Sequence, residues 1–324
     1  MTQTISVLGD GAWGTAFATV LAANGHRVTL WCFDPRAADS IQKTRENSVF
    51  LPGAKLSELI TPTTDCAQAC TSDIIFQAIP VQFLRQALTS CAPHVTEKQL
   101  WVSLSKGIED VTLMLPTDIM RQVLGSHITT AAISGPSFAI DVARQQPTIV
   151  AIAAASETIQ KTLAQLLTNA YFSCVPTNDL LGAQLGGALK NIFALGTGIL
   201  TGAGYGNNTQ VLLVLKGLRE MATLMDAMGG NPATLYGPSG IGDMMLTCFG
   251  KQSRNNQVGV LLGQGKKLAD VLAATQATAE GVNTLQSIWS LAQKYRVPLP
   301  ISNALYQIVW KGEPVTVLIE SLRG

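Results

Sequence analysis

A glycine-rich turn near the start of the chain most constrains what it can fold into. The apolar run Ile5–Leu8 leads into Gly9-Asp10-Gly11-Ala12-Trp13-Gly14, and a helical pattern follows over Thr15–Ala23. In a G-x-G-x-x-G turn, the first glycine permits the tight bend, the second lets backbone approach a pyrophosphate and the third lets helix and strand pack closely. The helix N-terminus adds unpaired N–H groups. The turn therefore predicts a dinucleotide-binding β–α–β unit rather than a glycine bend without a ligand.

The second expected strand, Val28–Cys32, is followed by residues suited to the ribose end of a dinucleotide. Asp34 lies 20 residues beyond Gly14, near the spacing of an acidic residue that holds a ribose hydroxyl. It is equally suited to capping the helix that follows. Arg36 could instead meet a 2′-phosphate, and Phe33 could stack against the adenine. NAD and NADP therefore both stay open as cofactors.

Short apolar runs alternate with helical patterns through the first half of the chain. The expected strands are Ile5–Leu8, Val28–Cys32, Ile74–Ile79, Leu100–Ser103, Ala131–Ser134, Thr148–Ala153 and Phe172–Val175. The expected helices in this half are Thr15–Ala23, Val81–Cys91, Pro116–Leu124 and Glu157–Leu167. The alternation predicts an α/β fold with a Rossmann-type, doubly wound, mostly parallel sheet and helices on both faces.

No strand is expected after Pro176, where helical patterns take over. They cover Leu180–Leu195, Thr209–Met228, Asn256–Gly263, Leu268–Thr275, Val282–Tyr295 and Ile301–Trp310. We therefore expect a dinucleotide-binding Rossmann-type domain over residues 1–177 and an all-helical substrate and catalytic domain over residues 178–324.

Charged side chains are scarce, with 22 basic and 21 acidic residues among 324. The net charge of +1 and the lack of a basic block leave no footprint for nucleic acid. The longest stretch without such a residue, 191–215, is interrupted by glycines and by Asn207–Gln210, which favours a buried helix pair over a membrane span. Met1–Thr4 lacks the basic region of a signal peptide, so we expect a cytoplasmic protein.

The six cysteines and three histidines show no ligand pattern. No two cysteines form a C-x-x-C pair, and three lie in apolar surroundings, as reduced core cysteines do. His26, His94 and His127 are far apart in the sequence. Neither a metal site nor a Ser-His-Asp triad is therefore expected.

Lys190 is the most informative charge. It is the only Asp, Glu, Lys or Arg between Leu180 and Leu215, on a helix that should be largely buried. Lysines are almost never fully buried unless paired or used, and a desolvated amine can serve as a general base. The alternative is that its head group reaches water. Asp243, among apolar neighbours, could hydrogen-bond Lys190 and orient it, or it could cap the next helix.

Four further segments are candidates for binding a ligand. Open α/β sheets bind ligands beyond the carboxyl ends of their strands, where Ser105-Lys106-Gly107 and Ser134-Gly135-Pro136-Ser137 are expected. Lys106 offers a cation unless it is a solvated loop lysine, and Ser137 could merely cap a short helix. Arg254, within Ser253-Arg254-Asn255-Asn256, can hold a phosphate through two hydrogen bonds unless the segment is only a polar turn. Glu280 is a lone acidic group at the start of a helix.

Together these motifs resemble those of the bacterial NAD(P)-dependent glycerol-3-phosphate dehydrogenases, over essentially the whole chain. The segments that carry the resemblance are Gly9–Gly14, Ser105–Gly107, Ser134–Ser137, Gly186–Asn191, Gly240–Cys248, Ser253–Asn255, Glu280-Gly281 and Pro300-Ile301.

The resemblance implies a role for each matching position. It implies that Lys190 is the proton acceptor in glycerol 3-phosphate oxidation. The implied substrate-binding residues are Lys106, Gly135, Ser137, Lys190, Asp243, Ser253, Arg254 and Asn255. The implied cofactor-binding residues, beside Gly9, Gly11, Gly14 and Asp34, are Ala12, Trp13, Phe33, Lys106, Ala139, Arg254, Thr278 and Glu280. The implied reaction is the reversible NAD(P)H-dependent reduction of dihydroxyacetone phosphate to sn-glycerol 3-phosphate, and it needs no metal. Its product supplies glycerophospholipid synthesis.

Three positions depart from the common pattern of that family. Phe33 stands where a basic residue or histidine is frequent, which leaves a preference for NADPH in doubt. Val81 stands where a serine is common, and Lys216 where an arginine is frequent.

Other functions fit some of the same residues. A related two-domain β-hydroxyacid dehydrogenase could use Arg254 to hold a carboxylate substrate. A non-enzymatic dinucleotide sensor would need the glycine turn but not Lys190. A nucleotide-loop methyltransferase is a weaker alternative, because an all-helical second half is unusual there. A homodimer is possible, since the apolar second half could leave a hydrophobic face to cover.

Overall fold

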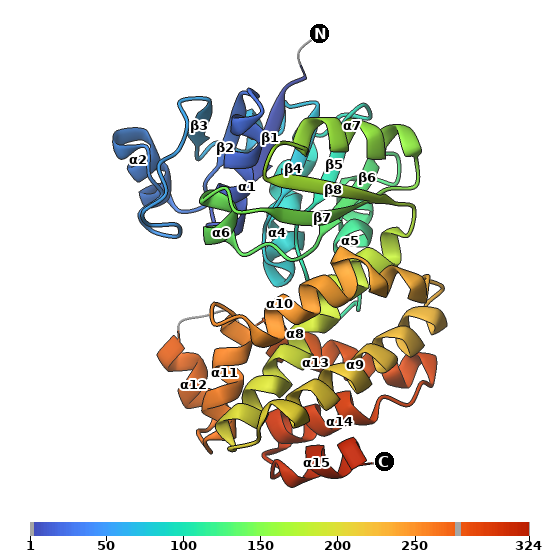
Figure 1. Cartoon of the computed structure of the whole chain (residues 1–324). Coiled ribbons are helices and arrows are strands. Elements are labelled where there is room, and N and C mark those ends of the chain that lie inside the picture. Colours follow the sequence, from blue (N-terminus) through green and yellow to red (C-terminus); the bar gives the residue numbers. More distant parts are fainter. Residues whose placement is uncertain (1–2, 276–279, 324) are drawn as a thin grey trace. The chain divides into compact units, whose positions relative to one another are not determined.

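The computed structural model describes residues 3–275 and 280–323. They form two compact units (Figure 1). Each unit has its own apolar core. The first unit contains Met1–Lys106 and Pro116–Leu180, and the second contains Gly107–Leu115 and Leu181–Gly324. The segment Gly107–Leu115, which the sequence places in the first domain, thus belongs to the second unit.

The first unit is built on an eight-stranded sheet in the order β3-β2-β1-β4-β5-β6-β7-β8. Its strands are β1 (Ile5–Leu8), β2 (Val28–Trp31), β3 (Ile60–Thr63), β4 (Ile74–Gln77), β5 (Leu100–Ser103), β6 (Thr129–Ser134), β7 (Thr148–Ala153) and β8 (Phe172–Thr177). All neighbours are parallel except β6 and β7. The expected doubly wound, mostly parallel sheet is therefore confirmed, and β1 lies at its topological switch point.

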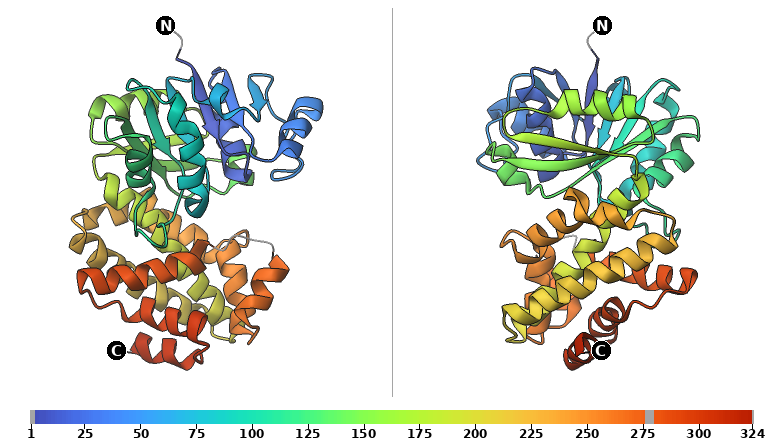
Figure 2. Two further views of the ribbon diagram at one scale, coloured as in Figure 1. Left: turned by 180° about the vertical axis from the view of Figure 1, so that it is seen from behind. Right: turned by 45° about the vertical axis from the view of Figure 1, so that its right-hand side comes forward.

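Helices lie on both faces of this sheet (Figure 2). They are α1 (Ala12–Ala23), α2 (Pro35–Thr44), α3 (Cys66–Ala69), α4 (Val81–Cys91), the short turn η1 (Ala92–His94), α5 (Pro116–Leu124), α6 (Ala139–Ala143) and α7 (Glu157–Leu167). On α1, Phe17 packs against Phe76 of β4 and Phe172 of β8, with ring centroids 4.9 and 6.4 Å away. One aromatic side chain thus joins the helix to both halves of the sheet.

Every strand expected from the sequence is present, but β3 is an addition. Its residues read Ile-Thr-Pro-Thr, and only Ile60 is buried. A proline and mostly accessible side chains suit an edge strand, which needs only one hydrogen-bonded neighbour. The short helices α3 and α6 were likewise not expected, because four or five residues are too few to show a helical period.

Among the residues that the structure describes, helices are the only regular secondary structure of the second unit. Its elements are α8 (Leu180–Gly202), α9 (Asn207–Ala227), the turns η2 (Pro232–Tyr236) and η3 (Pro238–Gly242), α10 (Asp243–Phe249), α11 (Arg254–Gly263), α12 (Leu268–Thr275), α13 (Glu280–Tyr295), α14 (Pro300–Tyr306), η4 (Gln307–Lys311) and α15 (Thr316–Arg323). Nearly all side chains of α8 from Gly182 to Leu200 are buried. The stretch 191–215 is thus shared by two helices, α8 and α9, as expected, but only the α8 part is largely buried, because Val211, Leu212 and Leu215 on α9 are exposed.

Within the described ranges, no helix has both the length and the apolar character that crossing a membrane requires.

Helix α8 runs seven residues beyond its expected end at Leu195, because its late glycines serve packing. A Cβ on Gly198 would lie 2.1 Å from the carbonyl oxygen of Asn256 on α11. A Cβ on Gly259 of α11 would in turn lie 2.1 Å from the carbonyl oxygen of Leu195. The two helices therefore touch backbone to backbone, which fixes α11 closely against α8.

A buried carboxylate joins two other helices of this unit. Glu220 on α9 accepts hydrogen bonds from the backbone N–H groups of Ile301 (2.5 Å) and Ser302 (2.9 Å) and from the Ser302 hydroxyl (2.6 Å). These donors stand in the first turn of α14, where backbone N–H groups lack partners within the helix. Glu220 therefore caps α14 from a distance of 81 residues in the sequence.

We expect Glu220 to make the thermal stability depend on pH. Burial raises the pKa of its carboxyl above the usual 4.5, despite the hydrogen bonds that oppose this shift. A carboxyl group whose pKa is higher in the folded than in the unfolded chain stabilises the fold at a pH below the unfolded-state pKa. This contribution is lost as the pH rises through the folded-state pKa. The Tm of the wild type should therefore fall by a few degrees relative to Glu220→Gln as pH is raised from 4.5 to 8 in a calorimetric series. A Tm difference that does not vary with pH would contradict this, and Glu320→Gln, on an exposed position of α15, is the control.

Candidate active site

The glycine turn after β1 shows which of its glycines the fold itself requires. Gly9 has a φ of +116°, a conformation that favours glycine. A Cβ on Gly14 would lie 2.0 Å from the carbonyl oxygen of Gly9, so only glycine fits there. A Cβ on Gly11 would meet no atom of the described chain within 4 Å. The position of Gly11 therefore leaves open space that a ligand can enter.

The first turn of α1 is suited to an anion. Gly11 precedes the helix, no side chain in the described part of the chain caps it, and its first turn holds no acidic residue. The indole N–H of Trp13 is buried without a partner among the described residues. Uncapped N–H groups and the positive end of a helix dipole suit a pyrophosphate. The turn thus fits the dinucleotide that the sequence predicts.

Two buried polar side chains brace this turn, and neither stands out in the sequence. A carboxylate oxygen of Asp10 accepts the backbone N–H of Asp34 at 3.0 Å, and burial raises the pKa of the Asp10 carboxyl. The side-chain amide of Asn47 donates to the carbonyl oxygen of Asp10 (2.7 Å) and to the hydroxyl of Thr15 (2.8 Å). Together they tie the turn to α1 and to the end of β2.

Asp34 and Arg36, the two side chains that would distinguish NAD from NADP, are bound to each other. Asp34 caps α2 by accepting the backbone N–H of Arg36 at 2.8 Å. The Arg36 guanidinium forms an ion pair with the same carboxylate, at 2.6 Å, and its hydrogen bond lowers the pKa of Asp34. Asp34 therefore caps α2, which is one of the two roles that the sequence suggests for it. The same carboxylate lies just after the end of β2, where a ribose would be expected. Phe33 beside them is 79% exposed, with its ring edge-on to Trp31.

Three of the expected substrate residues meet within the first unit. The ammonium of Lys106 donates to the carbonyl oxygen of Gly135 at 2.9 Å. The hydroxyl of Ser137 donates to the same oxygen, also at 2.9 Å. Ala139 follows as the first residue of α6, which packs against α1. The loops after β5 and β6 therefore lie side by side, as the carboxyl ends of neighbouring parallel strands must.

A buried glutamine sets the path of the loop that carries Lys106. Gln77, at the end of β4, donates to the Ser103 hydroxyl at 2.7 Å and accepts the Ser105 hydroxyl at 2.8 Å. The sequence signal is weak: one amide at the end of the apolar run Ile-Ile-Phe-Gln.

Lys190 is buried, and Asp243 and Thr247 hold it in the second unit. Its side chain is 8% exposed, and its ammonium donates to Asp243 Oδ1 at 2.5 Å and to Thr247 Oγ1 at 2.7 Å. The expected bond to Asp243 is therefore present, and the alternative in which the amine reaches water is wrong. Asp243 is itself buried, and its carboxylate stabilises the protonated amine in an environment that disfavours an unpaired charge. Nothing in the sequence marks Thr247.

The approach of Asp243 to Lys190 depends on close packing one helical turn away. Gly186 and Lys190 are four residues apart and share a face of α8. A Cβ on Gly186 would lie 2.3 Å from the carbonyl oxygen of Ser239, in the turn that leads to α10. The missing side chain at Gly186 therefore lets that turn approach, and Asp243 begins the helix that follows it.

A network of amides lies beside the lysine. The side chain of Asn255 donates to that of Asn191 at 3.0 Å and accepts the backbone N–H of Gly281 at 3.0 Å. Asn191 donates to the carboxylate of Glu280 at 3.4 Å. The residue after Lys190 is thus joined to α11 and to the first turn of α13.

Ser253 and Arg254 lie at the N-terminus of α11. Ser253 is buried and caps the helix by accepting the backbone N–H of Asn256 at 3.2 Å. Arg254 is the first helical residue and is exposed. The segment is therefore an ordered helix start rather than a polar turn, and its guanidinium is accessible. Of the remaining expected residues, Thr278 lies outside the described part of the chain.

Two family models match the chain. Residues 4–160 match "NAD-dependent glycerol-3-phosphate dehydrogenase N-terminus", and residues 179–320 match "NAD-dependent glycerol-3-phosphate dehydrogenase C-terminus". Among curated proteins, a glycerol-3-phosphate dehydrogenase [NAD(P)+] of Geobacter sp. (strain M21) is 41% identical over 97% of this chain and 95% of its own length. The protein of that name from Bacillus subtilis (strain 168) is 40% identical over 98% of this chain and 93% of its own length.

Solved structures are similar across the whole chain. A crystal structure of glycerol-3-phosphate dehydrogenase from Coxiella burnetii has a TM-score of 0.94 at 31% identity and covers 100% of this chain and 99% of that one. A structure of the D-mandelate dehydrogenase type, at 13% identity and a TM-score of 0.63, shares the fold alone.

Gly11→Ala should separate ligand binding from folding. The new methyl group has room in the protein but occupies the space at the first turn of α1. We expect the dissociation constants of NADH and NADPH, measured by fluorescence titration, to rise at least about tenfold, or roughly 1.4 kcal/mol. Gly206→Ala is the matched control, because Gly206 also precedes a helix and has no atom within 4 Å of an added Cβ. Unchanged dinucleotide affinity in Gly11→Ala, with a Tm like that of Gly206→Ala, would remove this turn from the binding site.

Proposed function

Because the chain belongs to the family of NAD-dependent glycerol-3-phosphate dehydrogenases, we propose that Lys190 is its acid–base residue and that Arg254 holds the phosphate of its substrate. The chain is an oxidoreductase that uses NAD or NADP and interconverts dihydroxyacetone phosphate and sn-glycerol 3-phosphate. The observation that carries the assignment of Lys190 is its buried ammonium, held at 2.5 Å by a carboxylate that is buried as well.

Lys190 exchanges a proton with the oxygen on the central carbon of the substrate. In reduction its ammonium gives a proton to the carbonyl oxygen, and in oxidation its amine takes the proton back from the hydroxyl. The nicotinamide cofactor, when bound, supplies or accepts the hydride. An amine that gains and loses a proton must avoid water as a competing partner, and the burial of Lys190 meets this need.

Asp243 and Thr247 are positioning residues for that amine. Both accept hydrogen bonds from its ammonium and so fix where that ammonium lies. Thr247 also donates to the carbonyl oxygen of Asp243 at 2.7 Å, one turn earlier on α10. This bond keeps the hydroxyl hydrogen away from Lys190, so its oxygen stays an acceptor for the ammonium.

The start of α11 holds the substrate phosphate. Arg254 offers a planar pair of N–H groups, and Ser253 and Asn255 flank it with polar side chains. The positive end of the helix dipole adds to the attraction. In the first unit, Lys106 with Gly135 and Ser137 supplies a second cationic contact that polarises or positions the reacting oxygen.

The glycine turn of the first unit would hold the cofactor. Gly9, Gly11 and Gly14 shape the turn that receives the pyrophosphate, and the N–H groups of Ala12 and Trp13 begin the helix. Asp34 would meet the ribose, and Phe33 would cover the adenine. Ala139, Arg254 and Glu280 would supply the other contacts that the resemblance implies. Turnover measured with NADH and with NADPH decides which cofactor the Asp34–Arg36 pair prefers.

The direction of the reaction and its setting are also proposals. Reduction of dihydroxyacetone phosphate would supply glycerol 3-phosphate for glycerophospholipid synthesis in the cytoplasm, and a depletion strain that grows without added glycerol 3-phosphate would contradict this. A homodimer would cover the exposed apolar face of α9 formed by Val211, Leu212 and Leu215. Light scattering of the purified chain distinguishes a dimer from a monomer.

The alternative functions lose their support. A sensor without catalysis needs no buried lysine paired with a carboxylate, and family membership favours the dehydrogenase over a methyltransferase or a β-hydroxyacid dehydrogenase.

Lys190→Ala should abolish most turnover while leaving cofactor binding intact. Loss of general acid–base catalysis lowers kcat by about 10²–10⁴-fold. Lys190→Arg keeps a positive charge beside Asp243 but cannot release a proton at neutral pH, so its kcat should fall similarly. Lys216→Ala, at a half-buried position of α9, is the control. Near wild-type turnover in Lys190→Arg, followed as NADH or NADPH oxidation with dihydroxyacetone phosphate, would show that Lys190 serves only as a charge.

Arg254→Ala should act on substrate binding. The loss of a charge-assisted contact costs about 1.5–3 kcal/mol, so KM for dihydroxyacetone phosphate should rise roughly 10- to 100-fold. The control is Arg219→Ala, which removes another arginine of the same unit, on α9. An unchanged KM in Arg254→Ala would place the phosphate elsewhere.

A further inference from the structure

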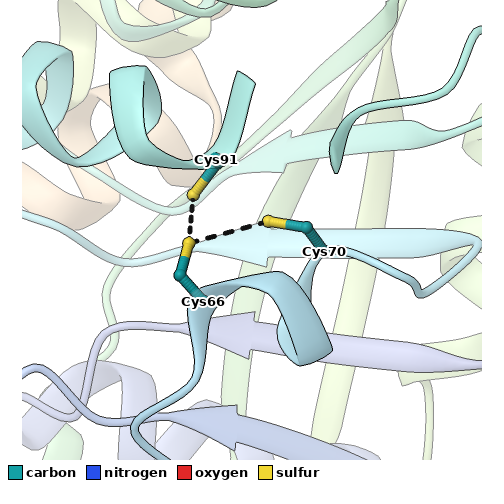
Figure 3. A group of neighbouring side chains, drawn as sticks. All are labelled: Cys66, Cys70 and Cys91. Atoms are coloured by element: carbon teal, nitrogen blue, oxygen red, sulfur yellow. Dashed lines mark hydrogen bonds between the residues drawn. The ribbon is translucent and has the colours of Figure 1, made fainter. Parts of the chain in front are cut away.

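Three cysteines that are separated in the sequence meet in the first unit (Figure 3). The sulfur of Cys66 lies 3.8 Å from that of Cys70 and 2.8 Å from that of Cys91. All three sulfurs lie within 4.8 Å of one another. The sequence does not predict this group, because the spacing from Cys66 to Cys91 is 25 residues and no C-x-x-C pair marks it.

Ordered backbone places each of the three sulfurs. Cys66 is the first residue of α3, and Cys70 follows directly after this helix. Asp65 caps the N-terminus of α3 by accepting a hydrogen bond from the backbone N–H of Ala67. Residues four apart share a helix face, so both sulfurs point the same way. Cys91 is the last residue of α4. The side chain of Gln99 donates to the carbonyl oxygen of Cys70 at 2.5 Å and holds that turn against the start of β5.

The cluster lies near the amino ends of the strands, whereas the glycine turn lies at their carboxyl ends. Helix α4 starts after the carboxyl end of β4 and runs back, so Cys91 at its end lies near the amino ends of the strands. Cys70 is likewise just before the start of β4. The glycine turn follows the carboxyl end of β1. The proposed reaction therefore does not use these thiols, and they need an explanation of their own.

The spacing of the sulfurs is close to what a metal ion requires. A Zn–S bond of about 2.3 Å in a tetrahedral site sets sulfurs about 3.8 Å apart. The Cys66–Cys70 separation already has this value, and the Cys66–Cys91 separation would open by about 1 Å. Thiolates select soft ions such as Zn(II) and Cu(I) over Mg(II) or Ca(II). Cys70 and Cys91 are buried, whereas Cys66 is half-buried and leaves an entry side.

We propose that Cys66, Cys70 and Cys91 form a binding site for one thiophilic cation, Zn(II) or Cu(I), that links α3 to the end of α4. The ion displaces the thiol protons, which leave to solvent, and the sulfurs become its three ligands. Water on the exposed side of Cys66 completes a tetrahedral Zn(II) site, and three sulfurs alone suffice for Cu(I).

Metal retention by the reduced full-length chain tests this site. Wild type, Cys66→Ser and Cys174→Ser are loaded separately with Zn(II) and with Cu(I), and the affinity of each is measured by competition with a chromophoric chelator. Cys174 is the matched control, because it is a half-buried cysteine of the same unit outside the cluster. We expect about one ion per chain in wild type and Cys174→Ser, and at least a tenfold weaker affinity in Cys66→Ser. The ion that wild type binds with the higher affinity, Zn(II) or Cu(I), is the one that the site selects.

X-ray absorption of the loaded wild type is the second measurement, which does not depend on any variant folding. It should show three sulfur ligands at about 2.3 Å for Zn(II). Wild type that retains neither ion, retention that is equal in Cys66→Ser, or an absorption spectrum without sulfur ligands would overturn the site. A Cys66–Cys91 disulfide in metal-free protein, found by mass spectrometry after thiol alkylation, would also overturn it and assign the cluster to redox chemistry.

Discussion

The buried ion pair of Lys190 and Asp243 is the interaction on which the second unit depends. An ammonium taken out of water costs several kcal/mol unless a carboxylate and further hydrogen bonds compensate it. The fold supplies both, from α10, and this requires α10 and α8 to approach within the length of a side chain. Gly186 permits that approach by removing a Cβ that would clash with the backbone before α10. The small residues of α8 are therefore a condition for keeping one charge inside an apolar helix bundle.

The architecture was accessible from the sequence because parallel strands are buried on both faces and read as short apolar runs. The strand Leu100–Ser103 has the predicted bounds for this reason. Where burial is one-sided or the element is short, the signal fails, as at the edge strand β3. Glycines mislead in a different way. In α8 they suggest an end near Leu195, yet the helix continues because Gly198 faces the backbone of α11.

The sequence predicts those residues of the candidate site whose side chains are unusual among their neighbours in the chain. Lys190 stands out because charge is scarce around it, and Asp243 because it interrupts an apolar segment. Thr247, Gln77 and Asn47 do not stand out, since threonines and amides occur throughout the sequence and only their neighbours in space give them a task. The three clustered cysteines show the same limit: a pair four residues apart and a third one 21 residues later carry no pattern, and only the docking of two helices brings them together.

The segment Gly107–Leu115 has a consequence for taking the molecule apart. The chain leaves the first unit after Lys106, contributes Ile108 and Leu115 to the second core, and returns to the first unit at Pro116. Asp110 of this strap also accepts a hydrogen bond from Ser287 on α13, at 3.1 Å. A single cut therefore cannot yield two intact halves. A fragment that starts at residue 178 would expose the apolar surface that the strap covers, so the helical unit expressed from that residue would lack part of its own core.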